Sequence, residues 1–267
     1  MPGWQRLARA DTSWLDADDE LGRRTLATSR DFVAACTVHF DQYFADAIAA
    51  GICQVVILAS GLDARSYRLD CLADCVVFEL DQPKVLEYKL TTLAACGLSP
   101  KATLRTVAVD LRDAWESVLA ADGFDSTRRT AWLAEGLLPY VPSAGQQQLV
   151  DGITSLSALG SRLAAEAYPS STMHLGASRM AAWRDNSVKI RERLGVGVDV
   201  TTLTQQDDPT DIAALLTESG WTVVSVDSRD IMARHGRPVA DDLLDATPVA
   251  SLITAELRSQ KASTKTT

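Results

Sequence analysis

The sequence has few aromatic residues, few histidines and no long hydrophobic run. Aromatic residues make up 6% of its 267 residues, and its three histidines, His39, His174 and His235, are scattered singly. No stretch approaches the ~20 apolar residues that a membrane-spanning helix needs, and the N-terminal segment lacks the apolar core of a secretory signal. We therefore expect a cytoplasmic protein that does not span a membrane.

Basic charge is also scarce. The 26 Lys and Arg residues are outnumbered by 35 Asp and Glu residues, which gives a formal net charge of -9. Proteins that bind nucleic acid gather Lys and Arg against the phosphates, and an anionic membrane surface attracts basic rather than acidic segments. We therefore expect neither a nucleic-acid nor a membrane partner. The oligomeric state is left open.

Cysteine is present but forms no recognisable site. An odd number of cysteines without a secretory signal favours reduced thiols. One pair is closely spaced, but no second Cys or His pair completes a zinc site. We expect no metal, and we interpret the cysteines as small buried hydrophobic residues. They are Cys36, Cys53, Cys71, Cys75 and Cys96.

Short β-branched runs alternate with longer stretches of helical spacing, which predicts a doubly wound α/β sheet with right-handed crossovers. The first three strands are nearly continuous apolar runs, as expected of parallel strands covered on both faces. The expected strands are Gln54–Ser60, Cys75–Asp81, Leu104–Asp110, Thr130–Leu137, Arg162–Tyr168, Thr222–Asp227 and Ser251–Leu257. The expected helices between them are Pro83–Ala95, Leu111–Ala121, Ser143–Leu159 and Pro209–Ser219.

The chain is expected to form one domain over residues 1–267. Its first part, residues 1–50, is predicted to be a helical segment, with one or two helices over Asp16–Ala50. Residues 169–208 interrupt the alternation and are predicted to form a cap insertion above the strand ends. Ligands bind at the carboxyl ends of the strands in open α/β sheets, so the cap would cover the site.

Three successive strand ends carry the residues that suggest a cofactor. After the first strand comes a turn with Gly61, although Ala59 and Ala64 replace the other glycines of a G-x-G-x-x-G pattern. Asp81 ends the second strand, placed to accept hydrogen bonds from ribose hydroxyls. Asp110 and Leu111 follow the third strand, where they could meet the amino group and the face of adenine. Together they define a crevice for an adenosine moiety.

Adenosine is shared by NAD and S-adenosyl-L-methionine, and the turn favours the second. A dinucleotide needs its pyrophosphate cradled at a glycine-rich helix N-terminus. This turn carries Asp63 and lacks two glycines, which disfavours an anion. A nicotinamide dehydrogenase is therefore the less favoured interpretation, and S-adenosyl-L-methionine is the expected cofactor.

Four segments resemble the leucine carboxyl methyltransferase family, and more closely its bacterial branch of S-adenosyl-L-methionine-dependent methyltransferases. They are VVILASGLDARSYRL (Val55–Leu69), VVFELDQPKVLEYK (Val76–Lys89), VAVDLRDAW (Val107–Trp115) and AWLAEGLLPYVP (Ala131–Pro142). The resemblance implies a Rossmann-like, seven-stranded class I methyltransferase sheet whose last two strands are an antiparallel hairpin. It also places Glu135 where the family has an acidic residue at the cofactor–substrate junction. The expected cofactor-binding residues are Ala59, Gly61, Asp81, Asp110, Leu111 and Glu135.

The chain departs from the family in one segment. Bacterial relatives carry an Arg before the first strand, available to the cofactor carboxylate, where this chain has Cys36. A Cys cannot supply a bidentate donor, and Arg30 could substitute. This leaves two hypotheses open: O-methylation of a carboxylate or hydroxyl of a small molecule or peptide, or cofactor binding with little catalysis. No catalytic residue is assigned. Arg65 and Arg68 could attract a carboxylate substrate, but they are interpreted instead as surface residues of a short helix.

Overall fold

The computed structural model describes residues 19–168, 188, 192, 210–244 and 249–259. The chain divides into two compact units: Met1–Val38, Tyr168–Pro209 and Val226–Ser251 form the first, and His39–Ala167, Thr210–Ser225 and Leu252–Thr267 form the second. The predicted cap, 169–208, falls outside the described residues apart from 188 and 192, and both the cap and the single-domain organisation stay predictions. Among the described residues, no helix is long and apolar enough to cross a membrane.

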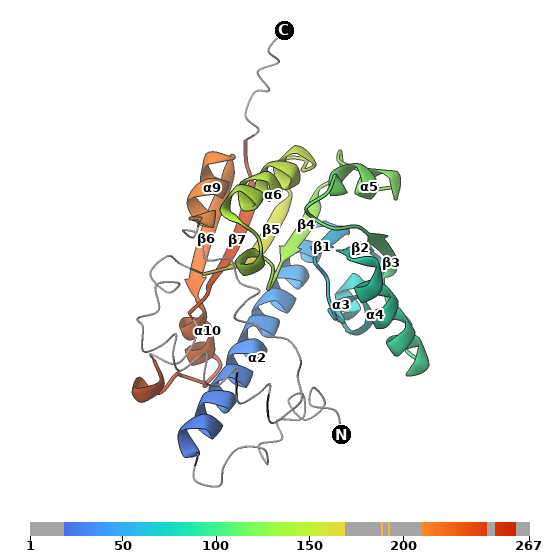
Figure 1. Ribbon diagram of the computed structural model, residues 1–267. Coiled ribbons are helices and arrows are strands. Elements are labelled where there is room, and N and C mark those ends of the chain that lie inside the picture. The colour runs from blue at the N-terminus through green and yellow to red at the C-terminus, as the bar shows by residue number, and fades with distance from the viewer. Residues whose placement is uncertain (1–18, 169–187, 189–191, 193–209, 245–248, 260–267) are drawn as a thin grey trace. The chain divides into compact units, whose positions relative to one another are not determined.

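All seven predicted strands are present, with ends that differ from the predictions by a few residues. They form one sheet in the order β3-β2-β1-β4-β5-β7-β6 (Figure 1). The strands are β1 (Gln54–Leu58), β2 (Val76–Asp81), β3 (Thr103–Ala108), β4 (Thr130–Ala134), β5 (Arg162–Ala167), β6 (Trp221–Asp227) and β7 (Ser251–Leu257).

The first five strands are parallel, and β7 runs against its neighbours. β1 pairs in parallel with β2 and β4, β2 with β3, and β4 with β5. The N–H of Leu257, the last residue of β7, donates to Ser161, just before β5, at 2.9 Å. The N–H of Ser228, just after β6, donates to Ala250, just before β7, at 2.9 Å. This confirms the antiparallel last pair that the family resemblance implies.

The four predicted crossover helices are present, and the N-terminal segment contains one long helix. The short helix expected to carry Arg65 and Arg68 is present as α3, and α10 was not expected from the sequence. Among the described residues, the α-helices are α2 (Glu20–Ala49), α3 (Arg65–Arg68), α4 (Pro83–Ala95), α5 (Trp115–Ala121), α6 (Ser143–Ser155), α9 (Ile212–Glu218) and α10 (Ser228–Arg234). Short 3₁₀ segments cover Asp70–Leu72, Leu138–Tyr140 and Asp241–Leu243. Helices α6 and α9 lie side by side (Figure 1).

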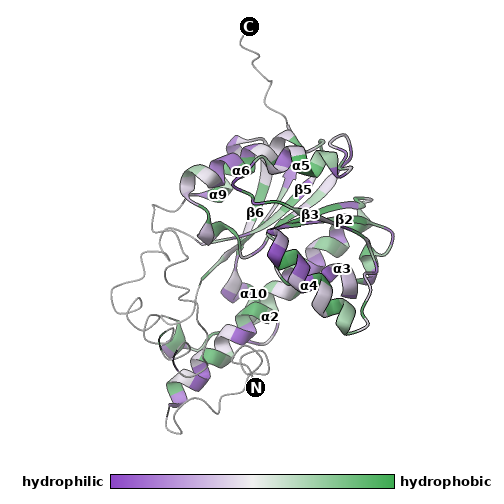
Figure 2. Ribbon diagram, turned by 45° about the vertical axis from the view of Figure 1, so that its right-hand side comes forward, coloured by the Kyte–Doolittle hydropathy of each residue, from purple (hydrophilic) through white to green (hydrophobic). Residues whose placement is uncertain are grey.

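The central strands supply the core of the second unit. Every residue of β1 and of β4 is buried, and Figure 2 shows that α4 carries both hydrophobic and hydrophilic residues. The expectation of two covered faces is wrong for β3, in which only Val107 is fully buried. The reason is its place at the edge of the sheet. The expectation for the cysteines is wrong in part, because Cys53 and Cys71 are half-buried and Cys96 is exposed.

Ion pairs hold the described part of the first unit. Arg24 donates to both carboxylate oxygens of Asp242, at 2.7 and 2.8 Å. Arg237 donates to Asp31 at 2.7 Å. These pairs tie the beginning of α2 to the segment after β6, although exposed pairs of this kind each contribute only about 0–1 kcal/mol.

A second type of ion pair is buried under the sheet. Glu79 in the middle of β2 is 0% exposed and receives Lys89 Nζ of α4 and the Ser66 hydroxyl of α3, at 2.5 and 2.8 Å. Burial raises the pKa of Glu79, while Lys89 and Ser66 act in the opposite direction. Lys89 therefore fixes α4 against β2, and Ser66 fixes α3 against the same strand.

The turn after β1 has a backbone conformation that favours glycine at two positions. Ala59 and Gly61 have φ values of 48° and 49°, and Ala59 is the one non-glycine residue with positive φ in the part of the chain that the structure describes. A left-handed conformation costs an L-residue about 1–2 kcal/mol. The turn between β1 and α3 is therefore strained at Ala59 and relaxed at Gly61.

Removing Lys89 should destabilise the protein strongly. We expect Lys89→Met to lower the free energy of unfolding by about 3–5 kcal/mol, because it leaves the Glu79 carboxylate buried and unpaired. Lys84→Met, an exposed position on the same helix, should change it by less than about 0.5 kcal/mol. Urea unfolding followed by circular dichroism measures both. Equal effects of the two substitutions would contradict this account of the pair.

Substitutions at Ala59 and at Gly61 should change the free energy of unfolding in opposite directions. Ala59→Gly relieves the strain at φ 48°, so we expect the free energy of unfolding to rise by about 0.5–1 kcal/mol, after the larger entropy of an unfolded glycine is counted. Gly61→Ala should lower it by about 1 kcal/mol. A Cβ at position 61 would lie 3.9 Å from the Ala59 carbonyl, so crowding is not the cause. The same urea titration tests both, and a gain from Gly61→Ala would refute the assigned conformation.

Candidate functional site

The residues at the carboxyl ends of β1, β2 and β3 are joined by hydrogen bonds. The Asp81 carboxylate accepts the Gly61 N–H on Oδ2 and the Gln82 N–H on Oδ1, both at 2.7 Å. The Val109 N–H donates to the Asp81 carbonyl at 3.0 Å. A carboxylate has about four lone-pair positions, so Asp81 keeps acceptor capacity while it fixes the turn beside it.

Asp110 is at the same edge but is more fully engaged. Its Oδ1 accepts the N–H and the Nε–H of Arg112, and its Oδ2 accepts Arg112 Nη2 and Gln82 Nε2. The hydrogen bonds from Arg112 lower the pKa of Asp110 to about 2. The Arg112 side chain is 80% exposed, so a ligand that donates to Asp110 would displace a partner that is weakly held.

The N-terminus of α3 is capped by a carboxylate. Asp63 Oδ1 accepts the Arg65 N–H at 2.7 Å, and Oδ2 contacts the Arg65 guanidinium. Helix α3 has four residues, so its dipole is small and its first N–H is already satisfied. The first N–H of α3 therefore bonds to a carboxylate of the chain itself, and that negative charge disfavours an anion beside it.

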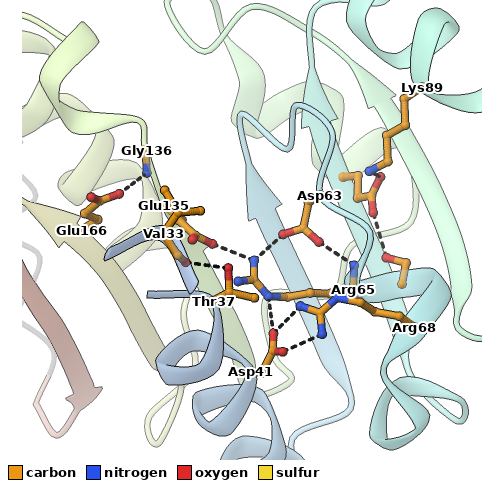
Figure 3. A network of polar contacts seen from close by, with 12 residues as sticks. Val33, Thr37, Asp41, Asp63, Arg65, Arg68, Lys89, Glu135, Gly136 and Glu166 are labelled. Carbon is orange, nitrogen blue, oxygen red and sulfur yellow. Dashed lines mark hydrogen bonds and ion pairs between the residues drawn. The ribbon is translucent and has the colours of Figure 1, made fainter. Parts of the chain in front are cut away.

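Arg65 is the centre of a network of carboxylates (Figure 3). Its Nε donates to Asp41 of α2 at 2.8 Å, and its Nη1 donates to Glu135, just after β4, at 2.7 Å. Arg68 binds both carboxylate oxygens of Asp41, at 2.5 and 2.6 Å. The Arg65 residue is 4% exposed. Its interpretation as a surface residue is therefore wrong, because three carboxylates with different chain positions converge on it. Arg68 is exposed, as expected.

The network sets the charge of its members. Burial raises the pKa of Glu135, and Asp63 and Glu166 add to this effect, whereas Arg65 opposes it. Burial also disfavours the charged form of Arg65, but Asp63, Glu135 and Asp41 outweigh burial and raise its pKa. For Asp41, the hydrogen bonds of Arg68 and Arg65 outweigh burial, so its pKa is lowered. The site holds more acidic than basic groups, which suits a cationic ligand group.

One buried polar atom in the turn has no partner. The Ser60 hydroxyl, between the two positive-φ residues, makes no hydrogen bond within the described part of the chain, and the residue is 5% exposed. Buried hydroxyls are normally hydrogen-bonded. An unsatisfied hydroxyl at this turn marks it as a place where a polar ligand atom would be stabilised.

The structure brings the predicted site residues together at one edge, but only some of them through direct contacts. Asp81 contacts Gly61, and Gln82 links Asp81 to Asp110. Ala59 and Leu111 pack against the buried core. Glu135 is connected to the turn through Arg65. Their roles toward a cofactor stay predictions.

Cys36, which stands where bacterial relatives carry an Arg, and Arg30 both lie in the first unit. Cys36 is buried, at 3% exposure. Arg30 lies on the same helix with its side chain 58% exposed and pairs with Asp31 at 3.7 Å. Whether Arg30 substitutes for the missing arginine stays a prediction.

Sequence reasoning missed Asp41, Ser60 and the central place of Arg65. Asp63 was noted only for its charge. A signal was available for two of them, because Asp63 and Arg65 are within the same motif, two residues apart, at the start of a helix. Asp41 gives no such signal, because its partners are 24 and 27 residues away.

Comparison with known proteins identifies the relatives of this chain. The family model described as "Leucine carboxyl methyltransferase" matches residues 2–154. A protein of Mycobacterium avium (strain 104) is 50% identical over 257 residues, and one of Mycobacterium bovis (strain BCG / Pasteur 1173P2) is 48% identical over 255 residues. The alignments cover 96% and 95% of this chain and 79% of each relative. Both relatives are named "Putative S-adenosyl-L-methionine-dependent methyltransferase".

Solved structures share the fold. A DUF574 family protein from Streptomyces avermitilis matches with a TM-score of 0.55 and 17% identity, over 95% of this chain and 89% of its own. Magnesium protoporphyrin IX methyltransferase from Synechocystis, solved with bound SAH, matches with a TM-score of 0.50 and 15% identity, over 96% and 94%. These confirm the class I methyltransferase sheet that the sequence predicts. The motifs, the fold and the extent of the family match agree: this chain belongs to the leucine carboxyl methyltransferase family.

Proposed function

We propose that this chain is an S-adenosyl-L-methionine-dependent O-methyltransferase that acts on a carboxylate, or a hydroxyl, of a small molecule or peptide. The observation that carries the proposal is the capping of α3 by Asp63, beside Asp81 and Gly61 at the strand ends. This edge offers carboxylates to an adenosine and places negative charge where a pyrophosphate would bind. Family membership and the relatives' names support the same cofactor.

The residues present fit this cofactor. Asp81 keeps lone pairs for the ribose hydroxyls, and Asp110 and Leu111 would meet the adenine. Gly61 would line the methionine portion, where a Cβ is absent and the backbone can approach closely. The Ser60 hydroxyl offers a further polar contact in the same turn. Glu135 would face the positively charged end of the cofactor.

Methyl transfer places simple demands on the protein. S-adenosyl-L-methionine, when bound, supplies a methyl group on a positively charged sulfur. The protein has to hold the acceptor oxygen in line with that methyl group. This positioning can lower the activation free energy by ~7–11 kcal/mol. The negative charge of Glu135 and Asp63 would favour binding of this positively charged group.

A carboxylate acceptor agrees best with the described residues. Carboxylates are ionised at neutral pH and need no general base, whereas a hydroxyl benefits from one. His39 stacks edge-on against Phe40 at 5.4 Å, and His174 lies outside the described residues. Arg65 and Arg68 are each paired with carboxylates, so the acceptor would be recognised by other groups.

Calorimetric titration tests the cofactor. We expect micromolar binding of S-adenosyl-L-methionine and S-adenosylhomocysteine and no binding of NAD. Asp81→Ala should weaken binding at least about 100-fold, because it removes the carboxylate that would accept hydrogen bonds from the two ribose hydroxyls. Asp74→Ala is a matched control, since Asp74 is exposed and precedes the same strand. Binding of NAD in place of the other two would overturn the proposal.

Transfer of an isotopically labelled methyl group tests the acceptor class. Candidate acids and alcohols are incubated with labelled S-adenosyl-L-methionine, and the product is treated with mild alkali, which hydrolyses methyl esters and spares methyl ethers. We expect alkali-labile label and a rate that is nearly constant from about pH 6 to about pH 9, where a carboxylate stays ionised. An alkali-stable product whose rate rises with pH would replace the carboxylate by a hydroxyl. Cofactor binding without turnover of any acceptor would favour a binding protein with little catalysis.

A further inference from the structure

The buried guanidinium of Arg65 connects parts of the second unit that are far apart in sequence. Asp41 of α2, Asp63 of the turn after β1, and Glu135 after β4 all contact it. Its side chain is 5% exposed, so these carboxylates replace the water that the cation loses. A buried cation of this kind is stable only while its partners remain in place.

The arrangement fixes directions as well as charge. A guanidinium is planar and presents five N–H donors at set angles, so Nε toward Asp41 and Nη1 toward Glu135 define one orientation for each carboxylate. Arg68 binds both oxygens of Asp41. Asp41 of α2 thereby holds the Arg65 side chain, and Arg65 Nη1 in turn fixes the orientation of the Glu135 carboxylate (Figure 3).

Glu135 is the member of the network that is best placed to meet a ligand. Its Oε2 accepts from Arg65 at 2.7 Å, and within the described part of the chain no hydrogen bond is made by Oε1. Its side chain is 26% exposed. The charged groups that face it are Arg65, Asp63 and Glu166, and only Arg65 favours its ionised form.

We propose that Arg65 is a positioning residue for the cofactor: it ties α2 and the turn after β1 to the end of β4, and it presents the free oxygen of Glu135 to the positively charged methionine portion. The inference rests on the proposed function, because it assumes that S-adenosyl-L-methionine binds at this edge. Arg65 acts through Glu135 and touches neither cofactor nor acceptor.

The pH dependence of cofactor binding distinguishes this role from a merely structural one. Binding of S-adenosyl-L-methionine is measured by calorimetry from about pH 4.5 to about pH 8 in wild type and in Arg65→Met. The pKa of Glu135 is raised by burial and held back by Arg65, so binding should fall as pH drops through that pKa. Without Arg65 the pKa rises further, and the midpoint of the loss should move upward by at least about one pH unit. Affinity at about pH 7.5 should fall at least about tenfold.

Two variants provide matched controls. Arg68→Met removes an arginine of the same helix that contacts Asp41 and, among the described residues, does not contact Glu135; it should cost less affinity than Arg65→Met and leave the midpoint unchanged. In a Glu135→Gln background, Arg65→Met should add little to the loss, because residues that act through one another are non-additive. Thermal unfolding of each variant verifies that it is folded.

Arg65→Lys keeps the proposal testable if Arg65→Met does not fold. A lysine retains the charge and loses the planar set of donors, so we expect weaker binding with the wild-type midpoint. Carbon-13 NMR of the Glu135 carboxyl carbon, assigned with Glu135→Gln, reports its titration without any cofactor.

Three outcomes are decisive. A wild-type protein that binds no cofactor overturns the proposed function, and this inference with it. A wild type that binds while Arg65→Met keeps the wild-type midpoint overturns the inference alone. Equal losses in Arg65→Met and Arg68→Met also overturn it, because they would indicate general loosening of α3.

Discussion

The pairing of the buried Arg65 guanidinium with carboxylates is the interaction on which the candidate site depends. A cation at 4% exposure has lost most of its water, so its partners have to be supplied by the fold. They come from α2, from the turn after β1 and from the end of β4. The charge network therefore determines how the glycine turn and the end of β4 are held together.

The sheet explains why those groups can meet. In a parallel sheet the carboxyl ends of all strands lie at one edge, and the order β3-β2-β1-β4 puts β1 between β2 and β4. Asp81 is the last residue of β2 and Glu135 comes just after β4, so the two approach the turn after β1 from opposite sides. Asp81 reaches it through the Gly61 N–H, and Glu135 reaches it through Arg65. Backbone topology thus supplies the convergence, and side chains supply the connection.

The sequence predicted the parts of the molecule that depend on local pattern. Apolar β-branched runs gave all seven strands, and Pro83 at a first-turn position gave the start of α4 correctly. Burial that depends on contacts distant in sequence was predicted less well. The residues of β3 resemble a buried strand, but an edge strand has a neighbour on one side only. Arg65 was taken for a surface residue because arginine is rarely buried, and its partner Asp41 is 24 residues away. The strand-end positions of Asp81 and Asp110 were predictable, whereas the engagement of Asp110 by Arg112 was not, since it requires side-chain geometry.

Comparison of the two buried ion pairs of the second unit indicates which of them can serve a ligand. Glu79 and Lys89 are 0% and 1% exposed and close on each other. Such a pair is weak support for stability compared with apolar packing, but it fixes which part of α4 meets β2. The Arg65 network is built differently, because its carboxylates Asp41 and Glu135 keep 22% and 26% of their side-chain surface exposed. Both oxygens of Asp41 are engaged by arginines, whereas Glu135 is bound through Oε2 alone, so Glu135 has a fixed direction and unused acceptor capacity. Binding of a cationic group requires these two properties. The Arg65 network has them, and the Glu79–Lys89 pair does not.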